Sequence, residues 1–324
     1  MQPFEEFEQE YAKHLGINDT VSVNTGTAAL HVALEALQLP PGSKVIVPEF
    51  TMYASALAVY YARLIPVFVD CQDDLLMDLN KLEEAIDEDT RVIMVTHIYG
   101  RLVDMTAIMS LAKKYNLRVI EDACEAQGAQ WEGKPIGTFD IGCFSLYRNK
   151  IIHAEEGGVV ASEDQDLLKI VRDMKSMSFG EHHNYYHERI GFNYRMTNSQ
   201  SLLGIESLRK YKENSTNRRM VESIYTSLLP STIKMPYRSA VWIYDFVSPK
   251  KDEIVKTLND LGVPARHSFK PMSMMPLFEE WASDYRKLNA YKQSKQIGYL
   301  PVYPDMTSNS IEKICYTVNT ILEK

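Results

Sequence analysis

Residues 91–122 read RVIMVTHIYGRLVDMTAIMSLAKKYNLRVIED, and this stretch decides the fold class. It holds two short apolar runs, 91–96 and 117–120, on either side of a helical pattern from Met105 to Tyr115. Strand, helix and strand in this order are typical of a crossover that joins two parallel strands. We therefore expect an α/β protein.

The same alternation continues on both sides of this stretch. It predicts a helix at 28–37 and four further strands at 44–47, 65–69, 143–147 and 158–161. These runs lack polar alternation, so they predict a mostly parallel sheet between helices. Ligands bind such sheets beyond the carboxyl ends of the strands. Polar residues that follow the strands are therefore site candidates: Glu49, Asp70, His97, Glu121 and Asp122.

The pattern changes near residue 198. A long helix is expected at 199–225, followed by a strand at 241–247, a helix at 251–261 that ends before Gly262, and a terminal helix at 310–323. A length of 324 residues fits about two domains. We expect a large cofactor-binding domain at 1–205 and a smaller C-terminal α/β domain at 206–324.

The composition excludes several classes of protein. The chain has 35 basic and 43 acidic residues, a net charge of −8, which argues against a general nucleic-acid binder. No apolar run is long enough to span a membrane, and the acidic N-terminal stretch is unlike a signal peptide. The four cysteines are scattered, without CxxC pairs or zinc spacing, and predict reduced thiols. We expect a cytoplasmic enzyme that binds neither nucleic acid nor membranes.

Other site motifs fail on their context. No GxGxxG occurs, and the GxxxxGK match at Gly128 to Lys134 is followed by Pro135 where a P-loop needs Ser or Thr. The HHNYYH cluster at 182–187 lacks the spacing of metal ligands. We expect no P-loop, no dinucleotide fingerprint and no metal site.

Three clusters are more informative together than apart. NTGT at 24–27 precedes a helix and predicts either an anion site or a plain helix cap. Asp122 follows a strand, where it would hold a ligand or cap the next helix, and Lys150 ends SLYRNK, although a single lysine is usually solvated. A phosphate cradle, a carboxylate and a lysine are what pyridoxal phosphate needs for anchoring, ring protonation and the Schiff base.

The chain resembles the DegT/DnrJ/StrS family of sugar aminotransferases, which have the type I aminotransferase fold. The resemblance is carried by six ordered blocks: NTGTAALHVAL, VIVPEFT, VTHIYG, VIEDACEAQGA, FSLYRNKIIHAEEGG and IGFNYRMTNSQSLLG. The FNYRMTNSQ block and the His/Tyr-rich loop before it are most similar to members of the perosamine-synthase type. The resemblance implies a pyridoxal phosphate enzyme that acts on nucleotide-linked sugars.

The resemblance assigns roles to individual residues. Lys150 matches the Schiff-base lysine, Asp122 the partner of the pyridine nitrogen, and Glu125 a residue near the ring hydroxyl. Further matches concern the phosphate, with Gly26 shaping the turn and contacts from Thr27, Ala28 and Ser145. Asn193 matches a phosphate contact supplied by the neighbouring subunit, which implies a homodimer with shared active sites.

The sequence departs from the family at several positions. Met52 stands where an aromatic residue usually stacks on the cofactor ring, and Tyr53 is adjacent. Glu155 replaces a common Gly, and Ser273 replaces a common His. The sequence also starts later than its relatives, in a part that often shapes their sugar site.

The resemblance implies conversion of a nucleotide-linked 4-keto-6-deoxyhexose to its 4-amino-4,6-dideoxy sugar, of perosamine or viosamine type, with L-glutamate as amino donor. A C3-specific aminotransferase of the same family shares every cofactor motif and stays open, as does the nucleotide: GDP, UDP or dTDP. A dehydratase of this fold would carry His in place of Lys150, and a non-catalytic regulatory protein would not need the full cofactor set. Candidate substrate contacts are Arg189, Arg195 and the segment 266–275.

Overall fold

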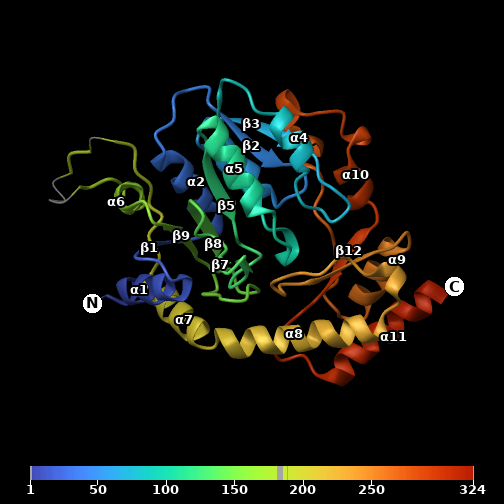
Figure 1. Ribbon diagram of the computed structural model, residues 1–324. Helices are drawn as coiled ribbons and strands as arrows, with labels where there is room; N and C mark the ends of the chain where they lie inside the picture. The colour runs from blue at the N-terminus through green and yellow to red at the C-terminus, as the bar shows by residue number, and fades with distance from the viewer. Residues whose placement is uncertain (1, 181–184, 188, 324) are drawn as a thin grey trace.

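A seven-stranded sheet forms the centre of the computed structural model, which describes residues 2–180, 185–187 and 189–323 (Figure 1). The strand order is β1-β9-β8-β5-β4-β2-β3. The strands are β1 (Thr20–Val23), β2 (Lys44–Pro48), β3 (Ile65–Val69), β4 (Thr90–Thr96), β5 (Arg118–Asp122), β8 (Ile141–Ser145) and β9 (Gly158–Ser162). The predicted α/β fold with a mostly parallel sheet is confirmed, and each of the six predicted strands is present.

The edge that contains β1 differs from a purely parallel sheet. Strand β9 runs antiparallel to both β8 and β1, so β1 has the same direction as β8. The carboxyl ends of β1, β5 and β8 therefore meet at one edge of the sheet. This topology brings the NTGT stretch after β1 beside Ser145 at the end of β8.

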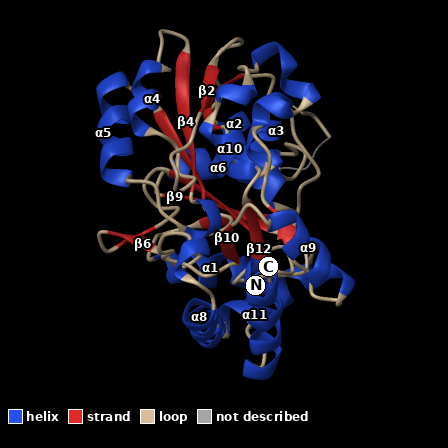
Figure 2. Ribbon diagram, turned by 90° about the vertical axis from the view of Figure 1, so that its right-hand side faces the viewer, coloured by secondary structure: helices blue, strands red, loops and turns tan. Residues whose placement is uncertain are grey.

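Helices cover both faces of this sheet, as Figure 2 shows around β2 and β4. One buried cluster joins side chains of α1 (Pro3–Leu15), α4 (Leu79–Glu84), α5 (Met105–Tyr115) and α7 (Asn198–Arg209). The other cluster joins α2 (Gly26–Ala36), α3 (Tyr53–Tyr61) and α6 (Gln165–Met174). Successive residues of β4 alternate between the two, with Ile93 in the first and Met94 in the second, because neighbouring side chains of a strand point to opposite faces.

The C-terminal part contains a second, three-stranded sheet. Its order is β10 (Tyr244–Val247), β12 (Ile297–Leu300) and β11 (Arg266–His267), and all its pairs are antiparallel. It packs with α8 (Tyr211–Leu228), α9 (Lys251–Asp260) and α11 (Ser308–Glu323), and a separate buried cluster spans residues 221–321. Shorter elements complete the chain: α10 (Asn289–Ser294) and 3-10 turns at Ile98–Gly100, Ser231–Ile233, Met272–Met274, Pro276–Trp281 and Tyr285–Lys287.

The long helix predicted at 199–225 is wrong in one respect, because it is two helices. Helix α7 ends and α8 begins around Lys210, whose ψ of 1° departs from the helical value. The halves pack on different partners, α7 on α1 and α8 on α11, so the break lets each helix follow its own neighbour (Figure 1). Periodicity alone does not reveal this change of partner.

Three further observations concern the GxxxxGK match, the cysteines and the apolar character of the helices. The GxxxxGK match lies on a small hairpin of β6 (Gln130–Trp131) and β7 (Lys134–Pro135), with no helix after it, which confirms that it is not a P-loop. All four cysteines are free thiols, and Cys71, Cys143 and Cys315 are buried. Among the described residues, none of the helices has the length and apolar character needed to cross a membrane.

Candidate active site

A cavity of about 650 Å³ lies between the carboxyl edge of the large sheet and the C-terminal part. Seven of the predicted site residues line it: Gly26, Thr27, Met52, Asp122, Glu125, Ser145 and Lys150. Its opposite wall comes from Trp242, Arg266, Phe269, Tyr299 and Tyr303. The cavity therefore gathers residues that lie up to 278 positions apart in the chain (Thr25 to Tyr303).

The N-terminus of α2 forms one end of the cavity. Thr25 caps the helix, because its hydroxyl accepts a hydrogen bond from the Ala28 N–H at 3.0 Å. The amides of Gly26 and Thr27 have no acceptor within the helix and carry the positive end of its dipole. A Cβ on Gly26 would lie 2.7 Å from the Cβ of Ser145, so only glycine lets the helix approach β8 this closely. Two amides and the Ser145 hydroxyl thus form a cradle suited to an anion.

Asp122 lies at the end of β5 and is almost fully buried. Its Oδ2 accepts a hydrogen bond from the Ser55 hydroxyl at 2.7 Å, and its Oδ1 accepts one from the Cys124 N–H at 3.2 Å. The Ser55 hydroxyl also bonds Thr51 at 2.9 Å, and Thr51 bonds Thr96 at 2.9 Å. This chain of hydroxyls fixes the orientation of the carboxylate, and sequence reasoning missed it because α3, β4 and β5 supply it together.

Glu125 is buried beside the same wall. Its carboxylate accepts a hydrogen bond from the Tyr99 N–H at 2.7 Å. Burial raises the pKa of Glu125 to about 7, against an opposing effect of the Lys150 charge. Glu125 is therefore able to hold or release a proton near neutral pH, unlike an ordinary carboxyl group.

Lys150 is 8% exposed and lies in the loop between β8 and β9. Its Nζ is 3.5 Å from the centre of the Trp242 ring, a cation–π contact. Gln127 joins the start and the middle of the loop, since its amide donates to the carbonyls of Ser145 at 3.1 Å and Ile152 at 3.0 Å. The Lys150 amine thus lies inside the cavity, so Lys150 is not a solvated surface lysine.

The departures from the family pattern have local explanations. Met52 lines the cavity, whereas Tyr53 is directed to Phe278, with ring centroids 5.6 Å apart. Ser273 donates both its N–H and its hydroxyl to the buried Glu49 carboxylate, which anchors the Met272–Met274 turn to the end of β2. Glu155 has a φ of +63°, a left-handed conformation that glycine adopts without strain.

The candidates chosen for their place after strands, other than Asp122, do not line the cavity: Glu49, Asp70, His97 and Glu121. Four residues taken from the family resemblance or offered as substrate contacts do not line it either. Ala28 is not among the residues that line it, and its N–H donates to the Thr25 hydroxyl, so the phosphate contact expected of Ala28 stays a prediction. Asn193 and Arg195 are exposed outside the cavity, and Arg189 lies 3.8 Å from Asp173. The predicted substrate contacts of Arg189 and Arg195 stay predictions, and neither residue lines the cavity of its own chain.

The structure describes only residues 185–187 of the HHNYYH cluster at 182–187. His182 and His183, on which the prediction of no metal site at 182–187 depends, lie outside the described residues. Elsewhere in the described chain, no three His, Cys, Asp or Glu side chains gather as a metal site would require.

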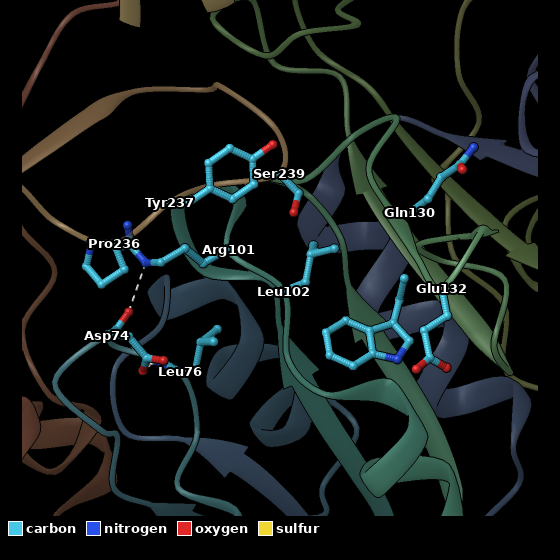
Figure 3. A pocket seen from close by; sticks show the side chains of 10 residues that line it. Asp74, Leu76, Arg101, Leu102, Gln130, Glu132, Pro236, Tyr237 and Ser239 are labelled. Carbon is cyan, nitrogen blue, oxygen red and sulfur yellow. Dashed lines mark hydrogen bonds between the residues drawn. The ribbon is translucent and has the colours of Figure 1, made fainter. Parts of the chain in front are cut away.

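A second hollow of about 440 Å³ shares no lining residue with the first. Figure 3 shows Arg101, Tyr237 and Glu132 around it. Arg101 is already committed there, because its Nε donates to the Asp74 carbonyl at 2.9 Å and its terminal nitrogens bind Asp245. The hollow therefore offers a structural arginine rather than a free charge.

The residues of the larger cavity fit pyridoxal phosphate. The α2 cradle matches the phosphate, the fixed Asp122 carboxylate matches a protonated pyridine nitrogen, and the buried Lys150 amine matches the covalent attachment. Gly26 is informative here, because a side chain at that position would occupy the space beside Ser145.

Comparisons with known proteins agree with this site. The model of the DegT/DnrJ/EryC1/StrS aminotransferase family matches residues 2–319. GDP-perosamine synthase of Caulobacter vibrioides is 34% identical, over 98% of this chain and 89% of that protein. A UDP-N-acetyl-3-dehydro-alpha-D-glucosamine 3-aminotransferase of Acidithiobacillus ferrooxidans is 32% identical, over 97% and 87%.

Among solved structures, DesV of S. venezuelae in complex with a ketimine intermediate superposes with a TM-score of 0.94 at 28% identity, over 100% of this chain and 90% of that one. Both the sequence and the fold thus match across the whole chain. The chain belongs to the DegT/DnrJ/EryC1/StrS aminotransferase family, whose aminotransferases use pyridoxal phosphate.

Proposed function

We propose that this enzyme transfers the amino group of L-glutamate to C4 of a nucleotide-linked 4-keto-6-deoxyhexose, which gives a perosamine- or viosamine-type sugar. The observation that carries this proposal is the cavity, in which Lys150, Asp122, Glu125 and the α2 cradle lie together. The similarity to a GDP-perosamine synthase over nearly the whole chain supports the choice of C4.

The chain's own residues divide the chemistry among them. The bound cofactor supplies an electron sink that stabilises negative charge on the reacting carbon. Lys150 Nζ would move the proton from the donor's α-carbon to the bound cofactor in one half-reaction, and from the cofactor to the sugar carbon in the other. Asp122, fixed by Ser55, would keep a positive charge on the ring nitrogen, and the α2 amides with Ser145 would hold the phosphate. One base on one side therefore serves both half-reactions.

The substrate side of the cavity carries positive charge. Arg148 and Arg266 line the cavity together with Tyr299 and Tyr303. A net charge of −8 requires such local cationic groups if the chain is to bind a sugar diphosphate. We assign the diphosphate to this side, and the nucleotide base to the part of the site beyond it.

A homodimer is part of the proposal. Asn193, Arg195 and Arg189 lie outside the cavity of their own chain, which supports their service in the neighbouring subunit's site. The four free thiols support a reducing compartment, and we assign the enzyme to the cytoplasm.

Amination at C3 is the second candidate. It is favoured by the 3-aminotransferase relative, which is nearly as similar to this chain as the perosamine synthase. The cofactor residues do not distinguish the two positions, because they contact the cofactor and not the sugar.

The test incubates the purified protein with L-glutamate and, separately, GDP-, UDP- and dTDP-linked 4-keto-6-deoxyhexoses and a 3-keto sugar nucleotide. Mass spectrometry follows amine formation, and NMR locates the new amine. Product with a 4-keto substrate and glutamate is expected, and product only with the 3-keto substrate assigns the enzyme to C3.

The matched variants are Lys150→Ala, expected to lose turnover and the visible absorbance of the cofactor-bound protein, and Lys210→Ala, an exposed lysine expected to keep both. Turnover that survives in Lys150→Ala contradicts the assigned base. A colourless wild-type protein without turnover indicates a non-catalytic member of the family.

A further inference from the structure

Arg218 of α8 makes an unusual set of contacts beneath the cavity. Its Nη1 donates to the carbonyls of Trp242 at 3.0 Å and Val302 at 2.7 Å. Its Nη2 donates to the carbonyls of Asn149 at 3.1 Å and Lys150 at 3.3 Å. Arg218 as a whole is 3% exposed, so these four bonds form away from solvent.

The charge of Arg218 is balanced by backbone dipoles. Within the described part of the chain, no carboxylate accepts a hydrogen bond from it or lies in ion-pair contact with it. Burial lowers the pKa of Arg218 to about 10, which still leaves it charged at neutral pH. The Arg218 Nε has no hydrogen-bond partner among the described residues, so the four carbonyl bonds of Nη1 and Nη2, with the charge of nearby Asp305, offset the cost of burying this cation. The fold therefore depends on keeping these carbonyls in place.

The neighbouring Arg219 provides a contrast. It pairs with the Glu222 carboxylate and donates to the carbonyls of Arg238 and Ser239. Its side chain is 38% exposed, and none of its partners lines the cavity. Two consecutive arginines on one helix thus differ in whether they touch the site.

The four carbonyls belong to both walls of the cavity. Asn149 and Lys150 lie in the loop after β8, Trp242 precedes β10, and Val302 follows β12, and all four line the cavity. The side chain of Trp242 also contacts those of Asn149 and Lys150. The Trp242 Nε1 donates to Asn149 Oδ1 at 3.3 Å, and Lys150 Nζ lies 3.5 Å from the Trp242 ring centre.

Resting on the proposed role of Lys150, we propose that Arg218 is a positioning residue. It ties the lysine loop, which is the loop between β8 and β9 that carries Lys150, to the cavity wall that contains Trp242. It thereby sets where the Lys150 amine lies in the cavity. One planar guanidinium fixes the main chains of Lys150 and Trp242, and the ring–amine contact follows from that fixed spacing. Lysine is a poor substitute for this role, because its single ammonium presents three donors from one point.

The test reads the amine directly in cofactor-free protein. Pyridoxal phosphate is added with borohydride, and the rate at which Lys150 is labelled is followed by mass spectrometry. Arg218→Lys is expected to slow labelling about tenfold or more, and to lower kcat by a similar factor with little change in the KM of glutamate. The matched control Arg219→Lys is expected to label at the wild-type rate.

A second variant does not depend on how well Arg218→Lys folds. Trp242→Leu removes the ring and leaves the four carbonyl bonds, and it is expected to slow labelling of Lys150 as Arg218→Lys does. Wild-type labelling rates in Trp242→Leu, or in folded Arg218→Lys, overturn the proposed role of Arg218 and leave the proposed function intact. Label that never reaches Lys150 in the wild-type protein overturns the proposed function and, with it, this inference.

Discussion

Glu125 shows how one buried side chain makes stability depend on pH. In the folded chain, burial raises its pKa from 4.5 to about 7. Between these values the folded state retains a proton that the unfolded state has lost. The free energy of unfolding therefore falls as the pH rises through this window, and the effect is complete above about pH 7.

Replacing Glu125 with Gln removes this titration. Relative to wild type, Glu125→Gln is expected to gain stability as the pH rises, by up to about 3 kcal/mol at about 1.4 kcal/mol per pH unit. Urea unfolding of both cofactor-free proteins at about pH 5 and about pH 8 measures the difference. Glu253→Gln, on the exposed side of α9, is the control, and a pH-independent difference for Glu125→Gln contradicts the raised pKa.

Glu155 has a strained backbone conformation and lies in the loop between β8 and β9, the same loop that carries Lys150. Its φ is +63°, and its carbonyl accepts the Arg148 N–H at 2.9 Å. Glu155→Gly is expected to be tolerated, whereas Glu155→Val is expected to destabilise the chain by about 1–2 kcal/mol, because β-branched residues are disfavoured at positive φ. Thermal and urea unfolding compare the free energies of unfolding of the two variants. Equal stability of Glu155→Val and Glu155→Gly contradicts the predicted strain at this position.

Individual site residues differ in how far sequence reveals them. Lys150, Asp122 and Glu125 sit in short blocks with recognisable neighbours, so local sequence was enough to propose them, and their catalytic roles stay predictions. Trp242 and Arg218 contact the lysine loop from 92 and 68 positions away. No periodicity or spacing within a short window encodes a partnership of that kind.

At the scale of elements, the close approach of α2 to β8 depends on Gly26. Gly26→Ala places a methyl group 2.7 Å from the Ser145 Cβ, so the helix N-terminus must move away from the phosphate cradle. Overpacking of this kind costs about 1–3 kcal/mol, which corresponds to about a tenfold or greater loss of cofactor affinity if the strain falls on the bound state.

Equilibrium dialysis of pyridoxal phosphate measures this loss. Ala33→Gly, in the buried middle of the same helix, is the control, because it weakens α2 by about 1 kcal/mol without adding an atom near the cradle. Equal affinity in Gly26→Ala and wild type shows that α2 adapts without cost.

The elements themselves were predictable where burial is continuous. Five of the six strands predicted for the large sheet are mostly buried, whereas three of the five residues of β3 are half-buried, and the observed ends differ from expectation by a few residues. Strand β1 (Thr20–Val23) was not predicted, because it is only four residues long and depends on pairing with β9. That pairing joins distant parts of the chain, for example Val21 and Val160, which are 139 positions apart. Pairing partners and the split at Lys210 are tertiary properties, which local patterns do not contain.

At the scale of the whole molecule, a buried ion network joins the sheet domain's Arg101 to the C-terminal sheet. Asp245 on β10 binds Arg101 at 2.6 Å and Arg238 at 2.7 Å, and all three side chains are at most 3% exposed. Burial opposes ionisation of Asp245, but the two arginines together hold its pKa below the ordinary value.

Asp245→Asn is expected to destabilise the protein by about 3–5 kcal/mol, because among the described residues it leaves the buried Arg101 without a carboxylate partner and leaves Arg238 with Glu222 alone. Asp260→Asn breaks an exposed pair with Lys256 and is expected to change stability by less than about 0.5 kcal/mol. Urea unfolding compares the two at one protein concentration. A loss for Asp245→Asn as small as the control's contradicts the role of the network.

The division of the chain into domains at 1–205 and 206–324 stays a prediction. Two buried clusters draw mainly on the first part and one spans 221–321, which supports it. Met272 and Phe278, however, pack into a cluster of the large sheet, so the C-terminal part returns to cover it.

The cavity's two walls also impose an order on biosynthesis. A nascent chain emerges from the ribosome with Asp122 and Lys150 far ahead of Trp242 and Val302. Until the last of these residues is free to fold back, the reactive amine has neither its aromatic neighbour nor the Arg218 bonds that hold its loop. A complete cofactor site therefore forms only after residue 302 has been synthesised, and chains truncated before residue 302 should carry the lysine without a complete site to enclose it.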